Sequence, residues 1–433
     1  MAKSIIVVGL QWGDEGKGKV IDLLSERADC VVRAQGGNNA GHTIVVEDKE
    51  YKFHLVPSGA LNPKARCFIT GGTVIDPAVL LGEISGLEKS GIALKGRLKI
   101  SASAHLIMPY HRLFDRLYEL RKGKDAVGTT GKGIGPCYAD KALRIGFQIG
   151  ELLDPNSFKR KLSGVLAIKN QELRLLFAEP ELSLEQIYEE YIAFADGLKG
   201  FIYTDVETDL ALALDRNHRV LFEGAHGTFL DTTFGTYPYV TASSTLASGV
   251  AAGAGIGPTR IQHVLGVVKA YTTRVGNGPL PSALSDEDMR YFMDNISARE
   301  VGTTTGRNRR LAWFDAPLIR QAIHLNGVDS IALMKLDILD TLATIKICVA
   351  YQYKGGRIEI PPVLTSEWEF TEPVYEVLDG WKTDTSSIRQ VSDLPENAQR
   401  YLKKIEDLCG CPISLISTGP EREKTIFVTD VME

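Results

Sequence analysis

A glycine-rich segment near the N-terminus contains the residue types that bind phosphate. The segment from Gly13 to Lys19 reads GDEGKGK and fits the pattern GxxxxGK. Its glycines let backbone N–H groups approach an anion, and a helix that begins here adds a partial positive charge. A P-loop has Ser or Thr after the lysine as a magnesium ligand, but this chain has Val20. Asp14 would replace that hydroxyl as a hard oxygen ligand, unless the segment is only a glycine-rich connection with surface lysines.

A second glycine-containing loop ends in a histidine. It reads GGNNAGH and carries Asn38, Asn39, Gly41 and His42. A lone histidine is most often a packed or surface residue. This one follows a glycine loop that we expect to face the phosphate loop across a cleft. That position favours a catalytic role for His42.

Three further polar loops could bind substrate. Residues 127–136 read VGTTGKGIGP and could form a second anion cradle, although such a segment is often a flexible surface loop. Residues 222–228 read FEGAHGT and place Glu223 and His226 at a strand end, where ligands of open α/β sheets bind. Residues 303–310 read TTTGRNRR, and arginine suits carboxylate and phosphate recognition. This last loop could instead be a solvated basic loop or a nucleic-acid patch, and the acidic net charge disfavours the patch.

The C-terminal half contains a candidate guanine site. Lys335 to Asp337 reads KLD at the end of a predicted strand. The carboxylate would accept from the ring N–H and the exocyclic amine of guanine, a pair of donors that adenine lacks, and the lysine stem could lie over the base. Ser417 to Gly419 follows an apolar run and could donate N–H groups to the guanine carbonyl. Together with the phosphate loop, these residues favour GTP over ATP.

Apolar, β-branched runs place these loops at strand ends. Seven runs read as buried, mostly parallel strands: residues 5–8, 30–34, 67–70, 98–101, 220–222, 264–270 and 330–334. Residues 43–46 and 51–55 read as a hairpin. From about residue 102 to 200 the pattern is mainly helical, with helix starts at Asp154-Pro155 and at Ser183, which has capping-box spacing to Gln186.

This pattern predicts an α/β fold with a central, mostly parallel β-sheet, a P-loop-like phosphate site, a helical insertion and an α+β C-terminal region. The α/β core comprises residues 1–101 and 202–266, with the phosphate and catalytic loops. Residues 102–201 form the helical insertion. Residues 267–433 form the C-terminal region, with the arginine loop and the guanine-binding strands.

Composition narrows the class of protein. The chain has 433 residues, of which 44% are hydrophobic and 24% charged, as in soluble globular proteins. The net charge of −5 argues against nucleic acid or an anionic membrane as the main partner. No apolar run approaches ~18 residues, and the N-terminus passes directly into the phosphate loop without a signal peptide, so we expect a cytoplasmic protein. The six cysteines lack zinc-site spacing and read as buried thiols.

The chain resembles the adenylosuccinate synthetase family over essentially its whole length. Seven motifs carry the resemblance in the family's order: QWGDEGKGK (Gln11 to Lys19), NAGHT (Asn39 to Thr43), GTTGKGIGP (Gly128 to Pro136), GTYPYVT (Gly235 to Thr241), TTGRNRR (Thr304 to Arg310), KLD, and STGP (Ser417 to Pro420). QWGDEGKGK and GTYPYVT are highly specific to this family.

The resemblance implies a reaction, in which GTP, IMP and L-aspartate become GDP, phosphate and adenylosuccinate on the route from IMP to AMP. Asp14 would take the proton from the hypoxanthine ring nitrogen. The 6-oxo oxygen would attack the γ-phosphorus of GTP, with His42 stabilising the transfer and acting as an acid. The aspartate amine would then displace phosphate from 6-phosphoryl-IMP. Lys19, Mg²⁺ and loop N–H groups would neutralise the charge that grows on the phosphates.

The resemblance also implies which residues bind each substrate. GTP would be bound by Gly13, Asp14, Glu15, Gly16, Lys17, Gly18, Lys19, Arg309, Lys335, Leu336, Asp337, Ser417, Thr418 and Gly419. IMP would be bound by Asp14, Glu15, Gly16, Lys17, Asn39, Ala40, Gly41, His42, Thr130, Arg144, His226, Thr241 and Arg307. Aspartate would be bound by Thr303, Thr304, Thr305, Gly306, Arg307, Asn308 and Arg309. Asp14 and the Gly41 carbonyl would bind Mg²⁺, and Arg144 would come from the partner subunit of a homodimer.

Two positions depart from the family pattern. His226 stands where the family usually has an amide side chain, which puts one IMP contact in doubt. Asn308 stands where the family usually has a basic residue, which weakens the positive charge of the aspartate loop.

Two other classes of protein fit parts of the sequence. A GTP-binding switch protein would not need the second loop with His42 or the arginine loop, and an ATP-dependent carboxylate–amine ligase would not need Asp337.

Overall fold

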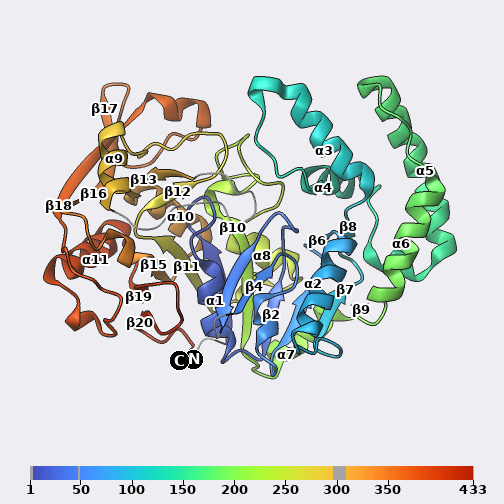
Figure 1. Ribbon diagram of the computed structural model, residues 1–433, viewed down its shortest axis with the longest axis horizontal. Helices are drawn as coiled ribbons and strands as arrows, with labels where there is room; N and C mark the ends of the chain where they lie inside the picture. Colours follow the sequence, from blue (N-terminus) through green and yellow to red (C-terminus); the bar gives the residue numbers. More distant parts are fainter. Residues whose placement is uncertain (1–2, 47–48, 296–308, 433) are drawn as a thin grey trace.

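The structure, a computed structural model, describes residues 3–46, 49–295 and 309–432, apart from the side chains at positions 42, 43, 45, 46, 49, 294 and 295. A ten-stranded sheet runs through its centre (Figure 1). In spatial order the strands are β20 (Thr425–Phe427), β19 (Ile413–Ser417), β15 (Ser330–Met334), β11 (His263–Lys269), β1 (Ser4–Gly9), β10 (Val220–Gly227), β2 (Cys30–Arg33), β5 (Arg66–Ile69), β7 (Leu98–Ser101) and β9 (Ile202–Tyr203). Neighbouring strands are parallel, except that β20 is antiparallel to β19, which confirms the predicted α/β fold.

The central strand β1 shows why its sequence is an unbroken apolar run. Ile6 and Val8 pack into one hydrophobic cluster with α8 (Ala247–Gly253) and α10 (Ala316–Asn326). Ile5 and Val7 pack into another cluster with α1 (Lys17–Ser25). Successive side chains of a strand point to opposite faces, and helices cover both faces here, so neither set can be polar.

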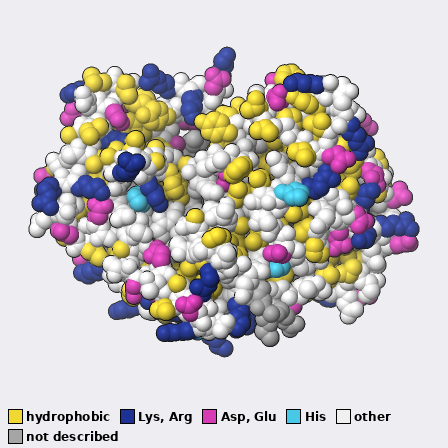
Figure 2. Space-filling view, turned by 180° about the vertical axis from the view of Figure 1, so that it is seen from behind, with side chains coloured by type: hydrophobic (Ala, Val, Ile, Leu, Met, Phe, Trp, Pro, Cys, Tyr) yellow, Lys and Arg dark blue, Asp and Glu magenta, His cyan; other side chains and the backbone are white. Residues whose placement is uncertain are grey.

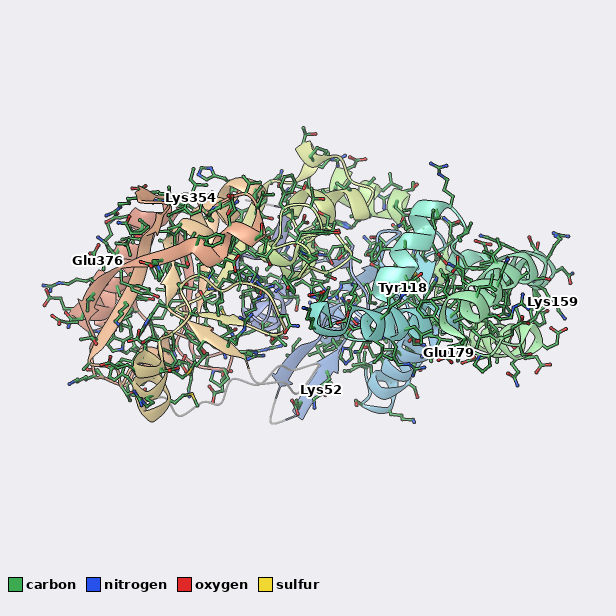
Figure 3. The ribbon with its side chains drawn as sticks, turned by 90° about the horizontal axis from the view of Figure 1, so that it is seen from above. Lys52, Tyr118, Lys159, Glu179, Lys354 and Glu376 are labelled. Carbon is green, nitrogen blue, oxygen red and sulfur yellow. The ribbon has the colours of Figure 1, made fainter. Side chains whose placement is uncertain are left out.

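Residues 102–201 are mainly helical, as predicted, and lie to one side of the sheet (Figure 1). They contain β8 (His105–Leu106), α3 (Pro109–Lys122), α4 (Ile134–Leu143), α5 (Pro155–Glu172) and α6 (Leu184–Leu198). Asp154 caps α5 by accepting from Ser157 N, and Ser183 caps α6 by accepting from Gln186 N, as the sequence predicted. Lys159 and Glu179 of this section lie at the opposite end of the molecule from Lys354 and Glu376 (Figure 3).

The C-terminal part contributes to two sheets. Strands β15, β19 and β20 extend the central sheet, while β14 (Phe314–Asp315), β16 (Thr344–Tyr353), β17 (Gly356–Ile358) and β18 (Thr371–Asp379) form a second one, near which α11 (Glu396–Cys409) lies. The proposed boundaries of core, insertion and C-terminal region stay a prediction.

The remaining elements connect these parts. The predicted hairpin is present as β3 (His42–Val46) and β4 (Lys49–Phe53). The others are β6 (Val74–Ile75), α2 (Pro77–Lys89), α7 (Val206–Asp215), β12 (Thr272–Arg274), α9 (Asp286–Asn295) and β13 (Arg310–Ala312). All six cysteines are free and buried. On the face seen from behind, side chains of both charges lie among apolar ones, in agreement with the small net charge (Figure 2).

Candidate active site

A cavity of about 740 Å³ brings together most of the predicted site residues that the structure describes. Its walls come from the phosphate loop, the loop after β2, the loop between α3 and α4, the segment after β10, and the turns after β15 and β19. The predicted residues that line it are Gly13, Asp14, Gly16, Lys17, Gly18, Lys19, Asn39, Ala40, Gly41, Thr130, His226, Thr241, Arg309, Lys335, Asp337, Ser417 and Gly419. They converge because parallel strands end at the same edge of a sheet.

The phosphate loop is held in shape by a buried carboxylate. Glu15 is fully buried and accepts from Gln11 N at 3.1 Å, Gly13 N at 2.9 Å and Lys17 Nζ at 2.6 Å. A Cβ atom on Gly9 would lie 2.4 Å from Glu15 Oε2, so that position requires glycine. The side chain of Glu15 therefore points away from the cavity, and its backbone alone is available to a nucleotide.

Asp14 and Arg309 meet at the mouth of this loop. Arg309 Nε donates to Asp14 Oδ2 at 3.0 Å, and Arg309 Nη2 forms an ion pair with the same oxygen at 2.9 Å. The Asp14 side chain is 30% exposed, and Asp14 adopts a positive φ of 58°. An accessible carboxylate in a phosphate loop can serve as a base or as a metal ligand.

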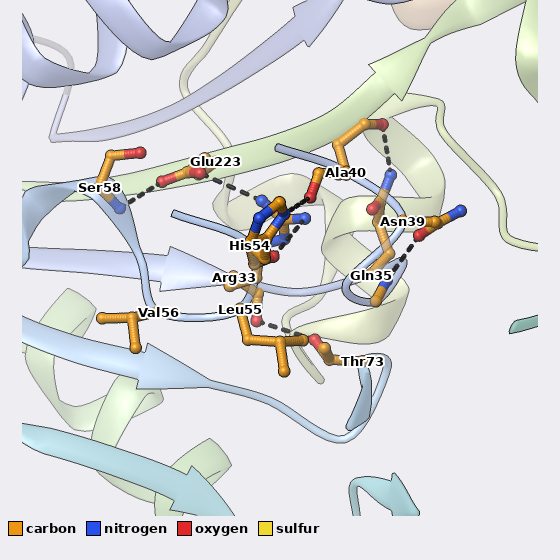
Figure 4. A network of polar contacts seen from close by, with 12 residues as sticks. Arg33, Gln35, Asn39, Ala40, His54, Leu55, Val56, Ser58, Thr73 and Glu223 are labelled. Carbon is orange, nitrogen blue, oxygen red and sulfur yellow. Dashed lines mark hydrogen bonds and ion pairs between the residues drawn. The ribbon is translucent and has the colours of Figure 1, made fainter. Parts of the chain in front are cut away.

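The loop after β2 is fixed from several sides. Asn39 Nδ2 donates to Thr241 Oγ1 at 3.1 Å, Lys132 Nζ donates to Asn38 O at 2.7 Å, and the His54 ring contacts Ala40 O at 2.9 Å (Figure 4). His42 begins β3, directly after this loop, and its side chain lies outside the described part of the chain. These contacts hold Asn39, Ala40 and Gly41 in the cavity wall.

Glu223, named in the sequence as a residue at a ligand-binding strand end, has another role. Strand β10 continues to Gly227, so Glu223 lies within the strand. It is fully buried, accepts from Ser58 N at 2.9 Å and pairs with Arg33 at 3.1 Å (Figure 4). The carboxylate thus compensates a buried guanidinium between β10 and β2 and stays out of the cavity.

His226 lies where β10 departs from regular pairing with β1. The register shifts between Val7 and Gly9, and His226 adopts a positive φ of 64°. This local turn of the backbone directs His226 to the cavity wall, close to Gly36.

The loop between α3 and α4 differs from the predicted anion cradle. The carboxylate of Glu119 accepts from Gly128 N and Thr129 N, and Asp115 Oδ2 accepts from Gly133 N at 2.9 Å. These backbone N–H groups need acceptors, and two acidic residues of α3 supply them. Thr130, which belongs to the same loop, still lines the cavity.

Arg144 lies outside this cavity. It follows α4 with a positive φ of 66° and is exposed beside the exposed Leu143. The structure therefore does not bring Arg144 to the other predicted IMP residues of its own chain.

The candidate guanine site has the polar groups that a base would need. Asp337 Oδ1 and Thr418 Oγ1 are buried without a hydrogen-bond partner among the described residues. Burial raises the pKa of Asp337, while the nearby Lys335, Lys19 and Lys424 oppose that rise. The Leu336 side chain is buried in the hydrophobic core and cannot contact a nucleotide.

One buried cation of the cavity wall was missed in the sequence. Arg274 is 1% exposed, donates to Pro279 O at 2.6 Å and Tyr239 O at 3.1 Å, and lies 5.2 Å from the centre of the Trp12 ring. Burial, and then Arg310, lower the pKa of Arg274 to about 9. In the sequence, the place of Arg274 at the end of a strand was the one signal that could have indicated this residue.

The predicted aspartate residues Thr303, Thr304, Thr305, Gly306, Arg307 and Asn308 lie outside the described part of the chain.

Comparison with known proteins agrees with this geometry. The profile of the adenylosuccinate synthetase family matches residues 6–426. The adenylosuccinate synthetases of Heliobacterium modesticaldum and Thermobifida fusca are each 49% identical over 425 residues, with 98% of each chain covered. The solved structure of fully ligated adenylosuccinate synthetase from Plasmodium falciparum superposes with a TM-score of 0.92 at 38% identity, covering 99% of this chain and all of the other. The chain belongs to the adenylosuccinate synthetase family.

Proposed function

We propose that the cavity converts GTP, IMP and L-aspartate to GDP, phosphate and adenylosuccinate through 6-phosphoryl-IMP, which makes the chain a GTP-dependent ligase that forms a carbon–nitrogen bond. One observation carries the proposal. The phosphate loop with Asp14, the loop that leads to His42, and the base-reading Asp337 face one cavity. A GTP-binding switch protein needs the first and third of these features but not the second, and nothing in the geometry or the comparisons favours it.

The chemistry follows from the groups on the cavity wall. Asp14 takes the proton from the ring nitrogen of IMP, and the 6-oxo oxygen attacks the γ-phosphorus of GTP as GDP leaves. His42 stabilises the charge on the transferred phosphoryl group and acts as an acid. The aspartate amine then attacks carbon 6, and phosphate leaves with the former oxo oxygen. Phosphorylation is needed because an oxo group of this kind is a poor leaving group.

Each substrate has its own set of residues in this proposal. GTP spans from the phosphate loop to Lys335, Asp337 and Ser417 to Gly419, with Arg309 beside its phosphates. IMP lies among Asn39 to His42, Thr130, His226 and Thr241, with Arg307. Aspartate lies against residues 303–309. Glu15 and Leu336 contribute their backbones only, because their side chains are buried elsewhere.

The donor set suits Mg²⁺. Magnesium binds through one or two carboxylates together with substrate phosphates and water, rather than in a cage of protein ligands. Among the described residues no group of three or more His, Cys, Asp or Glu side chains could form such a cage. Asp14 and the Gly41 carbonyl would hold the ion, which would neutralise phosphate charge when bound.

Arg144 supports a homodimer as the active form. Its exposed position at the end of α4 suits a cation that completes the IMP site of the partner subunit.

Of the helices that the structure describes, none has both the length and the apolar character of a membrane span. We place the enzyme in the cytoplasm, without nucleic acid or membrane as a partner.

The test is phosphate release from GTP with IMP and aspartate each omitted in turn. The ligase should release phosphate at its full rate only when all three substrates are present, and adenylosuccinate should form in equal amount. A switch protein would hydrolyse GTP slowly at a rate that neither IMP nor aspartate changes, and that result would refute the proposal.

A further inference from the structure

The ammonium group of Lys19 is bound by the loop that follows β19. Nζ donates to Ser417 Oγ, Gly419 O and Lys424 O, each at 2.8 Å. An ammonium group has three N–H donors, so these three acceptors use all of them. The lysine that the GxxxxGK pattern assigns to phosphate is therefore engaged with the part of the cavity expected to bind the base.

The same three acceptors also hold the loop together. Gly419 O accepts from Ser417 Oγ at 2.8 Å as well as from Lys19, and Lys424 O accepts from Thr418 N at 3.0 Å as well as from Lys19. A Cβ atom on Gly419 would lie 2.3 Å from the Lys424 side chain, so the loop is closely packed. Lys19 lies at the centre of this packing and joins both ends of the loop.

Charged groups around Lys19 support this position. Burial is the main influence and lowers the pKa of Lys19 to about 8, while Asp337, Glu421 and Glu423 favour its charged form and Arg389 opposes it. Asp337 is the predicted reader of guanine, so the lysine is electrostatically linked to the base site. A second link between helix and loop is Arg422, which donates to both carboxylate oxygens of Asp22 on α1 at 2.5 Å.

We propose that Lys19 is a positioning residue of the guanine site. It fixes residues 417–424 at the base site, and its contribution to GTP affinity acts on the base rather than on the phosphates. Phosphate binding then falls to the backbone N–H groups of the phosphate loop and of the first turn of α1, which begins at Lys17. This inference rests on the proposed GTP site and assigns one of its residues a different target.

Ligands that differ only in phosphate number test the proposal. Binding of guanosine, GMP and GDP to the full chain would be measured by calorimetry, for the wild type and for Lys19→Met. If Lys19 positions the base loop, all three ligands should lose affinity by the same factor, roughly tenfold or more for a charge-assisted contact. If guanosine binds both proteins equally and the loss grows with each phosphate, Lys19 is a phosphate ligand and the proposal is wrong.

A control variant isolates the effect of net charge. Lys403 is exposed on α11, outside residues 417–424, and pairs with Asp407 at 2.9 Å. Lys403→Met removes the same charge and should bind all three ligands as the wild type does. A wild-type chain that fails to bind guanosine would overturn the GTP site itself, and this inference with it. If the wild type binds guanosine but Lys19→Met loses affinity unequally for the three ligands, this inference alone would be overturned.

A pH profile provides a second test that does not depend on the folding of Lys19→Met. The neutral amine has two N–H donors instead of three, so guanosine affinity of the wild type should fall as pH rises through about 8. Lys19→Arg keeps its charge at every pH of interest and should show a flatter profile. Titration of guanosine itself is common to both proteins. Identical profiles would overturn the proposal.

Discussion

Arg309 donates a hydrogen bond from Nε to Oδ2 of Asp14 at 3.0 Å, and its Nη2 forms an ion pair with the same oxygen at 2.9 Å. The pair joins the phosphate loop to Arg309, the first described residue of the arginine loop. The guanidinium of Arg309 thus lies against the carboxylate that would take the proton from IMP. Proton transfer to Asp14 would also remove the charge that holds Arg309, which would leave the guanidinium free to follow the negative charge of a substrate. The contact therefore links the proposed base to the proposed aspartate and GTP residues.

Asp14→Asn should abolish turnover and leave the fold intact. The amide cannot accept the ring proton and is a poorer magnesium ligand, so we expect a loss of at least ~10³-fold in kcat. Steady-state rates with all three substrates saturating provide the measurement. Asp196→Asn, at a largely exposed position on α6, is a matched control and should keep wild-type activity. An Asp14→Asn enzyme with a tenth of normal activity would rule out the assigned role.

Arg309→Leu and Arg307→Leu should act on different substrates. Arg309 should chiefly affect GTP and Arg307 chiefly IMP, and both should disturb aspartate because they belong to one loop. Loss of a charge-assisted contact costs ~1.5–3 kcal/mol, or roughly 10- to 150-fold in affinity. Michaelis constants for each substrate, with the other two saturating, would separate the two residues. Equal effects of both variants on all three substrates would indicate a collapsed loop instead.

The sequence predicted those parts of the fold in which local pattern and tertiary packing agree. The apolar runs of β1 and β15 are strands because both faces are buried, and Asp154 and Ser183 cap the helices that follow them. These features depend on residues close in the chain. The positions of Asp14, Asp337 and Ser417 around one cavity also followed from the sequence, because parallel strand ends share an edge.

Side-chain partners far apart in the chain could not be predicted. Glu15 and Asp14 are neighbouring acids in one glycine loop, yet the first is buried under Gly9 and the second faces the cavity. Lys19 fits a phosphate pattern but finds its acceptors about 400 positions later in the sequence. A pattern specifies which groups are present, whereas the tertiary fold decides which acceptor each one reaches.

Asp337→Asn should weaken GTP and admit xanthosine triphosphate. Xanthine has a carbonyl where guanine has its amine, so an amide that can donate fits it better. Oδ1 of Asp337 is buried and has no hydrogen-bond partner among the described residues. This oxygen is the atom that would make the contact. The ratio of kcat/KM for the two nucleotides provides the measurement. A ratio unchanged by the substitution would show that Lys335 to Asp337 do not read guanine.

Glu119→Ala should raise the KM for IMP by roughly tenfold, because it removes a charged acceptor of two loop N–H groups beside Thr130. Glu119→Gln keeps an acceptor oxygen and should restore a KM close to that of the wild type. The KM for GTP should be unaffected in both variants, since the guanine loop lies elsewhere in the cavity. A Glu119→Ala enzyme with the wild-type KM for IMP would show that α3 does not position this loop.

His226 offers the prediction most particular to this chain. If its neutral imidazole replaces the family's amide as a donor to IMP, His226→Gln should be nearly silent, because one neutral hydrogen bond of ~0.5–1.5 kcal/mol replaces another. If it binds as a cation beside the nucleotide phosphate, IMP affinity of the wild type should fall as pH rises through the imidazole range near ~6.5, and the glutamine variant should lose that dependence. We expect the neutral donor, since Arg144 of the partner subunit and the loop that carries Thr130 would already meet the phosphate charge. The KM for IMP between about pH 6 and about pH 8.5, in both proteins and with the other substrates saturating, distinguishes the two cases. A steep rise confined to the wild type would refute the neutral donor, and an unchanged KM in His226→Ala would remove His226 from the IMP site.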